Sequence, residues 1–338
     1  MSIQSNLDRF QSKKWGIFNH FLGDNDAEAW NRRVDRVNVD LWAEQLAELG
    51  CGFMGITIMQ VFRTMLAPNE TYNQITGYKT GEACANREFI LDLSNALRKY
   101  DIDLMLYYTG DGPCRDSANI ANRAFGFTTP HYDFKKHEWV GVREPQFITE
   151  SFVDKWTSVL REYAIRYGDR VFAWWIDGCY KGNYTDEDTR EKYLKKYVDA
   201  VRAGNPDALI TFNNGYWGER RNDFEVDDPY SSCQYDNFTS GEEDTLFKPP
   251  ASRYVNGKQW FAFFCNGFWW PKECRGFPGK PEEIKKMTST RFTPDQLYDY
   301  VRAVNNGGGI VMFDTGFVND ERIDPRMWKA MSRLKELK

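Results

Sequence analysis

The stretch VFAWWIDGCY, residues 171–180, begins with six apolar residues and changes abruptly at Asp177. A short apolar run without polar alternation is typical of a parallel strand that is covered on both faces. The glycine that follows Asp177 indicates a turn at this point. We therefore expect a buried strand that carries an acidic side chain at its carboxyl end.

Similar apolar runs alternate with amphipathic helical patterns along the chain. The expected strands are 15–21, 53–59, 104–109, 171–177, 208–213, 231–235, 260–265 and 310–314. The expected helices are 40–49, 88–99, 152–163, 193–201, one that begins at Thr293-Pro294, and 327–337. This alternation predicts an α/β protein, a single (β/α)8 TIM-type barrel over residues 1–338. An open doubly wound sheet is the alternative, but neither a G-x-G-x-x-G nor a G-x-x-x-x-G-K-[ST] motif supports it.

Three long segments follow expected strands and are rich in glycine, proline, asparagine and aromatic residues. They are the loops 111–146, 236–258 and 266–290. In (β/α)8 barrels the loops at the carboxyl ends of the strands form the active-site face. Added length in these loops therefore predicts an elaborated pocket there.

Charge and hydropathy narrow the classes of partner. The net charge is −5 and the basic residues are scattered, so the sequence shows no concentration of positive charge that would bind the phosphates of a nucleic acid. No apolar stretch approaches a membrane span, and the first residues lack the apolar core of a signal peptide. Seven cysteines without C-x-x-C spacing fit a reducing compartment. We expect a cytoplasmic protein, or a periplasmic or secreted one if a leader was removed, and the sequence gives no oligomeric state.

Metal, cofactor and serine-nucleophile chemistry find little support. The three histidines, His20, His131 and His137, have no metal-ligand spacing, and no G-x-S-x-G motif is present. We expect neither a metal nor a cofactor.

The ends of the expected strands are unusually polar. Asp177 at such an end is a candidate catalytic carboxylate, although an aspartate before glycine can also simply cap a turn. A ring of hydrogen-bonding groups suits a polyhydroxylated ligand, and the high aromatic content of 16% suits sugar rings as well as a core. The candidate substrate-binding residues are His20, Gln60, Tyr107, Tyr108, Trp175, Asn213, Trp217, Asp236, Trp269 and Asp314; Trp175, inside a strand, fits core packing better.

The order of motifs resembles family 29 glycoside hydrolases, the α-L-fucosidases, over nearly the whole chain. The segments that carry the resemblance are KKWGIFNHF (13–21), VDLWAEQLAELGCGFMGIT (39–57), LMLYYTGD (104–111), YAIRYGDRVFAWWIDG (163–178) and LYDYVRAVNNGGGIVMFDTGFVNDERI (297–323). The fourth segment is similar to the family's helix and strand that end at its nucleophilic aspartate. The fifth is similar to the family's glycine-rich last strand.

The resemblance implies a retaining exo-glycosidase that acts on an α-L-fucoside or a related sugar. Asp177 would be the nucleophile that forms a covalent glycosyl-enzyme, and His20 would contact the sugar hydroxyls. The acid/base residue would be one of Glu225, Asp227, Asp228, Asp236, Glu242 and Glu243. The segment RNDFEVDDP (221–229) resembles the family's corresponding region, so Asp227 or Glu225 is favoured.

Several features depart from the family pattern. Met59-Gln60-Val61 stands where the family has two histidines, and Asp314 replaces an asparagine. We also expect no C-terminal β-sandwich of the kind that the family carries. Two alternatives therefore stay open. One is a carbohydrate-binding pseudoenzyme on the same barrel, and the other is a sugar lyase or epimerase.

Overall fold

The apolar run that begins at residue 171 contains strand β6 (Ala173–Asp177), and all five strand residues are buried. In the computed structural model, β6 lies in an eight-stranded sheet with the order β7-β6-β3-β2-β1-β12-β11-β8. The other strands are β1 (Trp15–Asn19), β2 (Phe53–Met59), β3 (Asp103–Thr109), β7 (Leu209–Phe212), β8 (Glu242–Glu243), β11 (Phe261–Cys265) and β12 (Ile310–Asp314). Neighbouring strands are parallel throughout. The α/β class expected from the alternation of runs is confirmed.

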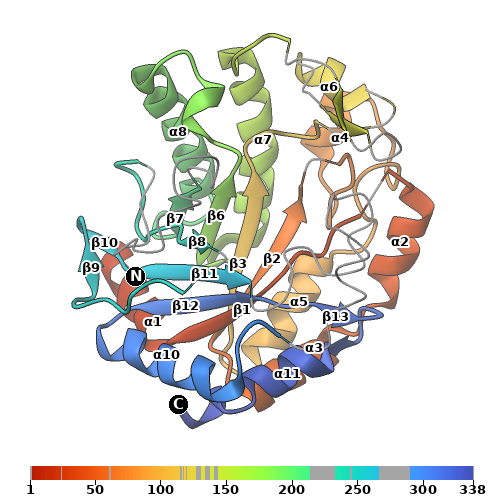
Figure 1. Cartoon of the computed structure of the whole chain (residues 1–338). Helices are drawn as coiled ribbons and strands as arrows, with labels where there is room; N and C mark the ends of the chain where they lie inside the picture. Colours follow the sequence, from red (N-terminus) through yellow and green to blue (C-terminus); the bar gives the residue numbers. More distant parts are fainter. Residues whose placement is uncertain are drawn as a thin grey trace.

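The structure describes residues 2–23, 25–60, 62–114, 116, 118, 120–126, 131–133, 138–140, 144–213, 233–243, 246–265 and 290–337. Within these ranges, most helices lie around the outside of the sheet (Figure 1), whereas α1 packs side chains into its inner cluster. They are α1 (Ile3–Ser12), α2 (Ala27–Arg36), α3 (Val39–Leu49), α4 (Glu70–Thr76), α5 (Phe89–Arg98), α6 (Ile120–Phe125), α7 (Glu150–Tyr167), α8 (Glu187–Arg202), α10 (Pro294–Asn306) and α11 (Pro325–Met331).

Local sequence explains where several helices begin and end. Thr293 and Gln296 form a capping box at the start of α10, and Pro294 occupies its first turn. Gly50 closes α3 with a φ of 77°, a left-handed conformation that glycine adopts without steric cost. A single helix is expected over 327–337. The structure instead has α11, which ends at Met331, followed by a 3-10 turn at Leu334–Leu337.

The sheet curls around an inner cluster of side chains. The cluster consists of Leu7, Phe10, Phe18, Phe53, Met105, Tyr107, Phe172, Ala173, Trp175, Leu209, Phe238, Phe261, Phe263, Ile310 and Met312. Helix α1 places Phe10 at the amino ends of the strands, with its ring centroid 5.0–5.7 Å from those of Phe53, Phe172, Phe238 and Phe261. One ring can touch residues this far apart in the chain only if the strands that carry them bend towards one another. The amino end is thus plugged, and the polar groups gather at the opposite end.

The expected sixth strand, 231–235, is wrong where the structure describes it, because residues 233–235 form a turn. The Asp236 carboxylate accepts hydrogen bonds from the amides of Cys233 and Phe212, at 2.8 Å each, and so joins the turn to β7. Asn237 bonds Ile210 of β7 through both its backbone and its side chain. Between β7 and β8, single hydrogen bonds therefore replace a regular ladder.

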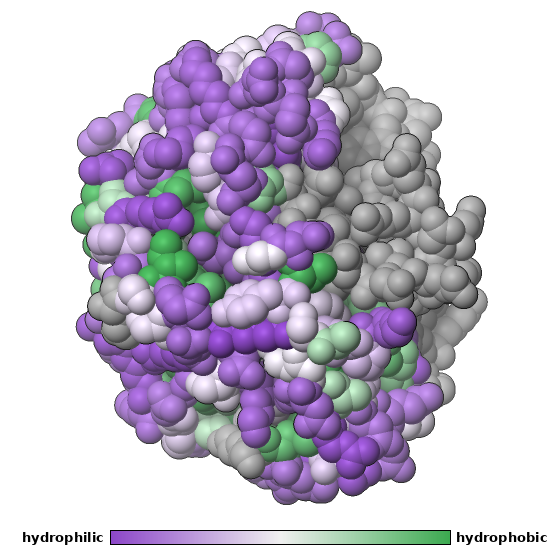
Figure 2. Space-filling view, turned by 90° about the vertical axis from the view of Figure 1, so that its left-hand side faces the viewer, coloured by the Kyte–Doolittle hydropathy of each residue, from purple (hydrophilic) through white to green (hydrophobic). Residues whose placement is uncertain are grey.

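The remaining strands are short antiparallel pairs in the loops. They are β4 (His131–Asp133) with β5 (Glu138–Val140), β9 (Tyr254–Val255) with β10 (Lys258–Gln259), and β13 (Phe317–Val318) with β14 (Arg322–Ile323). No helix in the described ranges is long and apolar enough to cross a membrane. The face seen in Figure 2 is mainly hydrophilic, and its hydrophobic residues form small separate groups.

Candidate active site

A cluster of polar side chains lies at the carboxyl ends of the strands, around Asp177. It follows from the alternation of side chains along each strand, in which every second residue points inward. Ala173 and Trp175 of β6 belong to the inner cluster, whereas Trp174 and Ile176 pack on the outer side. Asp177 is the next residue in the inward series. In β1 the residue two positions after the inward Phe18 is His20, and in β12 the residue two positions after the inward Met312 is Asp314. The inward side chains therefore change from apolar to polar at the carboxyl ends of the strands.

Asp177 is the centre of this polar layer and is only 8% exposed. Its Oδ2 accepts a hydrogen bond from the Tyr107 hydroxyl at 2.6 Å. Its Oδ1 accepts hydrogen bonds from the Tyr180 hydroxyl at 3.0 Å and from Asn213 Nδ2 at 2.9 Å. Three donors hold the carboxylate in one orientation.

A second carboxylate shares the amide of Asn213. Nδ2 of Asn213 also donates to Glu242 Oε2, at 2.5 Å. Because Asp177 Oδ1 and Glu242 Oε2 bind the same nitrogen, at 2.9 and 2.5 Å, they lie no more than about 5.4 Å apart. Retaining glycosidases separate their two carboxyl groups by about 5–5.5 Å, and inverting ones by about 6.5–9.5 Å. The upper limit on the distance between these two oxygens lies below the separation found in inverting enzymes.

His20 and Asp314 form a buried pair next to these carboxylates. Nδ1 of His20 lies 2.8 Å from Asp314 Oδ1, and the two side chains are 4% and 0% exposed. An ionised carboxylate only accepts hydrogen bonds, so with a charged Asp314 the donor in this contact is Nδ1 of the imidazole. The imidazole packs edge-on against Phe18, with ring centroids 4.7 Å apart, and near Tyr107, at 6.2 Å.

The two tyrosines on Asp177 are hydrogen-bond donors over a wide pH range. Burial raises the pKa of the Tyr107 hydroxyl well above its ordinary value of 10, and the negative charge of Asp177 raises it further. Burial and the same carboxylate also raise the pKa of Tyr180. Neither hydroxyl ionises near neutral pH, so both hydrogen bonds to Asp177 persist there.

Solved structures with this fold include several glycoside hydrolases. The endo-fucoidan hydrolase P5AFcnA of glycoside hydrolase family 107 is 15% identical, with a TM-score of 0.66 over 98% of this chain and 92% of that one. The α-L-fucosidase AlfC from Lactobacillus casei, in complex with α-L-fucose product, is 16% identical, with a TM-score of 0.61 over 98% of both chains. A family 29 α-L-fucosidase from Bacteroides thetaiotaomicron is 15% identical, with a TM-score of 0.60 over 98% of this chain and 73% of that one.

In fold, this chain resembles the fucose-active glycoside hydrolases. The resemblance to family 29 that the sequence motifs predicted is thereby confirmed for the fold. No family model matches the sequence, and no curated protein matches it either. The likeness at 15–16% sequence identity is therefore one of fold, and the activity depends on the chemistry of the site.

The turn after Asp177 is shaped by close backbone contacts. Gly178 has a φ of 71°, and a Cβ at this position would meet Asp111 Oδ1 at 2.1 Å. The buried guanidinium of Arg190 in α8 donates to the carbonyl of Cys179 at 2.9 Å. Because Asp177 and Tyr180 lie on either side of this turn, both contacts help to aim Tyr180 at the carboxylate.

Some predicted site residues lie outside the polar cluster for clear reasons. Tyr108 follows Tyr107 and faces the opposite side of β3, where its hydroxyl donates to the Trp156 carbonyl at 3.0 Å. The Asp236 carboxylate is bonded to backbone amides, as described above. Trp175 lies one layer below Asp177, stacked on Tyr107 with ring centroids 5.5 Å apart, and its indole donates to the Ser240 carbonyl. It supports the site from within the core.

Gln60 is buried at the end of β2, and its Oε1 has no hydrogen-bond partner among the described residues. The structure brings His20, Tyr107, Asn213 and Asp314 together around Asp177. Five candidate residues lie outside the described ranges: Glu225, Asp227, Asp228, Trp217 and Trp269.

Two members of the cluster were not singled out by sequence reasoning. Tyr180 stands in the turn that follows Asp177, and its short distance along the chain was an available signal. Glu242 was one of six acidic candidates, but nothing in its local sequence distinguished it. Only the fold brings it to Asn213, which is 29 residues away in the chain.

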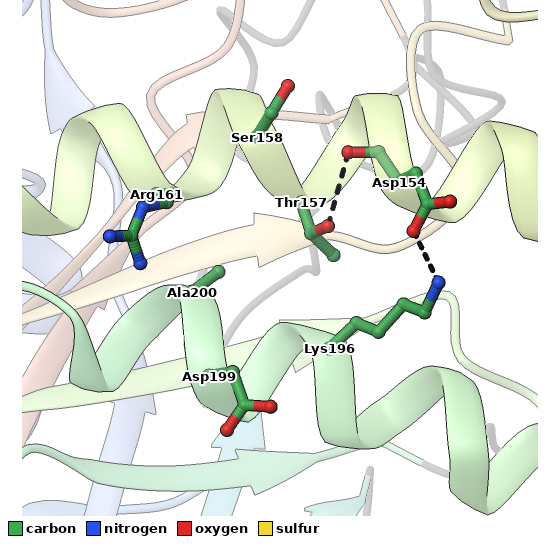
Figure 3. Close-up of a pocket in the computed structure, with 7 residues that line it drawn as sticks. All are labelled: Asp154, Thr157, Ser158, Arg161, Lys196, Asp199 and Ala200. Atoms are coloured by element: carbon green, nitrogen blue, oxygen red, sulfur yellow. Dashed lines mark hydrogen bonds and ion pairs between the residues drawn. The ribbon is translucent and has the colours of Figure 1, made fainter.

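A hollow of about 350 Å³ lies on the outer helices, between α7 and α8 (Figure 3). Its lining residues are Asp154, Thr157, Ser158, Arg161, Lys196, Asp199 and Ala200. Lys196 is ion-paired with Asp154 across it. None of these residues belongs to the polar layer at the strand ends, so the hollow is separate from the candidate active site. The described residues contain no group of three or more potential metal ligands.

Proposed function

We propose that this protein is a retaining exo-glycosidase that hydrolyses an α-L-fucoside or a related sugar. The observation that carries the proposal is the pair of carboxylates on one amide, with oxygens no more than about 5.4 Å apart. The fold shared with α-L-fucosidases supports the substrate class.

In the first step, a carboxylate oxygen of Asp177 attacks the anomeric carbon. The bond from that carbon to the leaving oxygen breaks as the new ester bond forms. The protonated Glu242 carboxyl gives its proton to the leaving oxygen, so the alcohol departs neutral. Tyr107, Tyr180 and Asn213 support this step because they hold Asp177 in place before the sugar arrives.

In the second step, water cleaves the glycosyl-enzyme. The Glu242 carboxylate takes a proton from the water molecule as its oxygen attacks the anomeric carbon. The ester bond to Asp177 breaks, which returns Asp177 as a carboxylate and Glu242 as an acid. Two inversions give net retention. This proposal replaces Asp227 and Glu225, favoured on sequence grounds, because Glu242 is the acid that the described residues bring beside Asp177.

The test combines a substrate screen with azide rescue. A nitrophenyl glycoside panel that includes the fucose and galactose series identifies the sugar. On the best substrate, Asp177→Gly and Glu242→Gly are each expected to lower kcat/KM by about a thousandfold or more. Added azide should give a glycosyl azide of inverted configuration with Asp177→Gly, because azide attacks the substrate directly. It should give one of retained configuration with Glu242→Gly, because azide then attacks the glycosyl-enzyme.

Two results would contradict the assignment. Full turnover by Asp177→Gly would remove Asp177 from the mechanism. The acid/base residue would instead lie in segment 221–229 if Glu242→Gly stayed active while Glu225→Gly or Asp227→Gly lost activity. The inactive variant should then give a glycosyl azide of retained configuration. Sugar binding in calorimetry without hydrolysis of any glycoside would favour the carbohydrate-binding pseudoenzyme. An unsaturated or epimerised product would indicate a lyase or an epimerase.

A further inference from the structure

Asp314 carries a buried carboxylate oxygen that the proposed mechanism does not use. The residue is 0% exposed and its Oδ1 is bonded to His20. Its Oδ2 is buried and has no hydrogen-bond partner among the described residues. A buried charged oxygen is costly unless a donor satisfies it. Among the residues that the structure describes, none donates a hydrogen bond to this oxygen.

Asp314 belongs to the same layer as the proposed nucleophile. It contacts His20, the His20 ring lies beside the Tyr107 ring, and the Tyr107 hydroxyl bonds Asp177 at 2.6 Å. Residues this close to one another face the same sugar ring if its anomeric carbon is at Asp177. Asp314 would then face a ring substituent rather than the leaving group.

The charges of this layer restrict what that substituent can be. Among the described inward residues at the strand ends, Asp177, Glu242 and Asp314 are acids, and the imidazole of His20 is the basic group beside them. A carboxylate can only accept a hydrogen bond, so it requires a donor such as a hydroxyl. It also repels a second negative charge in a site of low dielectric.

We propose that Asp314 is a specificity-determining residue that selects a neutral sugar ring with a free hydroxyl and rejects a ring with an anionic substituent at that position. The inference rests on the proposed function and names the substrate class of the same site.

The test measures binding by calorimetry, using L-fucose, its monofluoro analogues at each ring hydroxyl, and its monosulfates. Fluorine cannot donate a hydrogen bond. In the wild-type protein, the fluoro analogue at one position should bind about 10- to 100-fold more weakly than L-fucose, and the sulfate at that position should bind more weakly still. In Asp314→Asn, both penalties at that position should shrink by about tenfold.

The matched control is Asp103→Asn, which removes a buried carboxylate at the amino end of β3, where Arg9 and Lys13 pair with it. It should leave the binding pattern unchanged. The wild-type measurements also decide the question if Asp314→Asn fails to fold. Equal binding of all the fluoro analogues would overturn the inference but leave the proposed function intact. Failure of L-fucose and related neutral sugars to bind at all would overturn both.

Discussion

The adjacent residues Tyr107 and Tyr108 illustrate how one position in a strand decides what a side chain does. Both are buried, both have hydroxyls that donate to an oxygen, and burial raises the pKa of both well above 10. They differ because successive side chains point to opposite faces of a strand. Tyr107 reaches the Asp177 carboxylate, whereas Tyr108 reaches the backbone of α7.

This difference gives a matched pair of variants. We expect Tyr107→Phe to lower kcat/KM by about 10- to 100-fold, because a hydrogen bond to a charged group contributes about 1.5–3 kcal/mol. Tyr108→Phe should lower the melting temperature through the loss of a buried hydrogen bond, at a cost of about 1 kcal/mol, and leave kcat/KM within a few-fold. Equal kinetic effects of the two variants would show that the Tyr107 contact has no special part in the reaction.

At the scale of the element, the turn after β6 decides where Tyr180 points. The turn requires a positive φ at Gly178 and space beside Asp111 that a side chain would fill. Arg190 of α8 bonds the same turn from behind. The strand, the turn and the helix therefore form one unit that aims both Asp177 and Tyr180.

We expect Gly178→Ala to disturb this unit. A residue other than glycine costs about 1–2 kcal/mol in the left-handed region, and the clash with Asp111 adds to this. Both the melting temperature and kcat should fall. Gly257→Ala is the control, because Gly257 has a similar φ of 75° and a Cβ added there would have no other atom within 4 Å. It should lower stability by a similar backbone cost and leave kcat unchanged; a loss of kcat in both variants would count against the aiming role.

At the scale of the whole molecule, the two ends of the sheet have opposite characters. Helix α1 seals the amino end with Phe10, whose ring contacts four other phenylalanine rings. The carboxyl end collects the acids, amides and hydroxyls of the candidate site. The apolar end therefore contributes stability, while the polar end buries groups such as Asp314 Oδ2, which has no hydrogen-bond partner among the described residues.

Phe10→Ala tests this division. Truncating a fully buried phenylalanine costs about 3–5 kcal/mol, so we expect a marked loss in the free energy of unfolding, measured in urea. At temperatures where the variant remains folded, KM should stay close to that of the wild type, because the polar layer is at the other end of the sheet. A large change in KM with little change in stability would contradict this picture.

The sequence by itself determined the α/β class, most of the strands and the position of Asp177, because runs of apolar residues and turn residues act locally. His20 and Asp314 were also found by counting to the ends of strands. Only the tertiary structure showed that residues 233–235 form a turn, that Tyr108 faces away from the site, and that Asn213 bridges Asp177 and Glu242. These outcomes depend on contacts between residues distant in the chain, such as the Asp236 carboxylate on the Phe212 amide. Such pairings are made by the folded chain as a whole, and no local pattern encodes them.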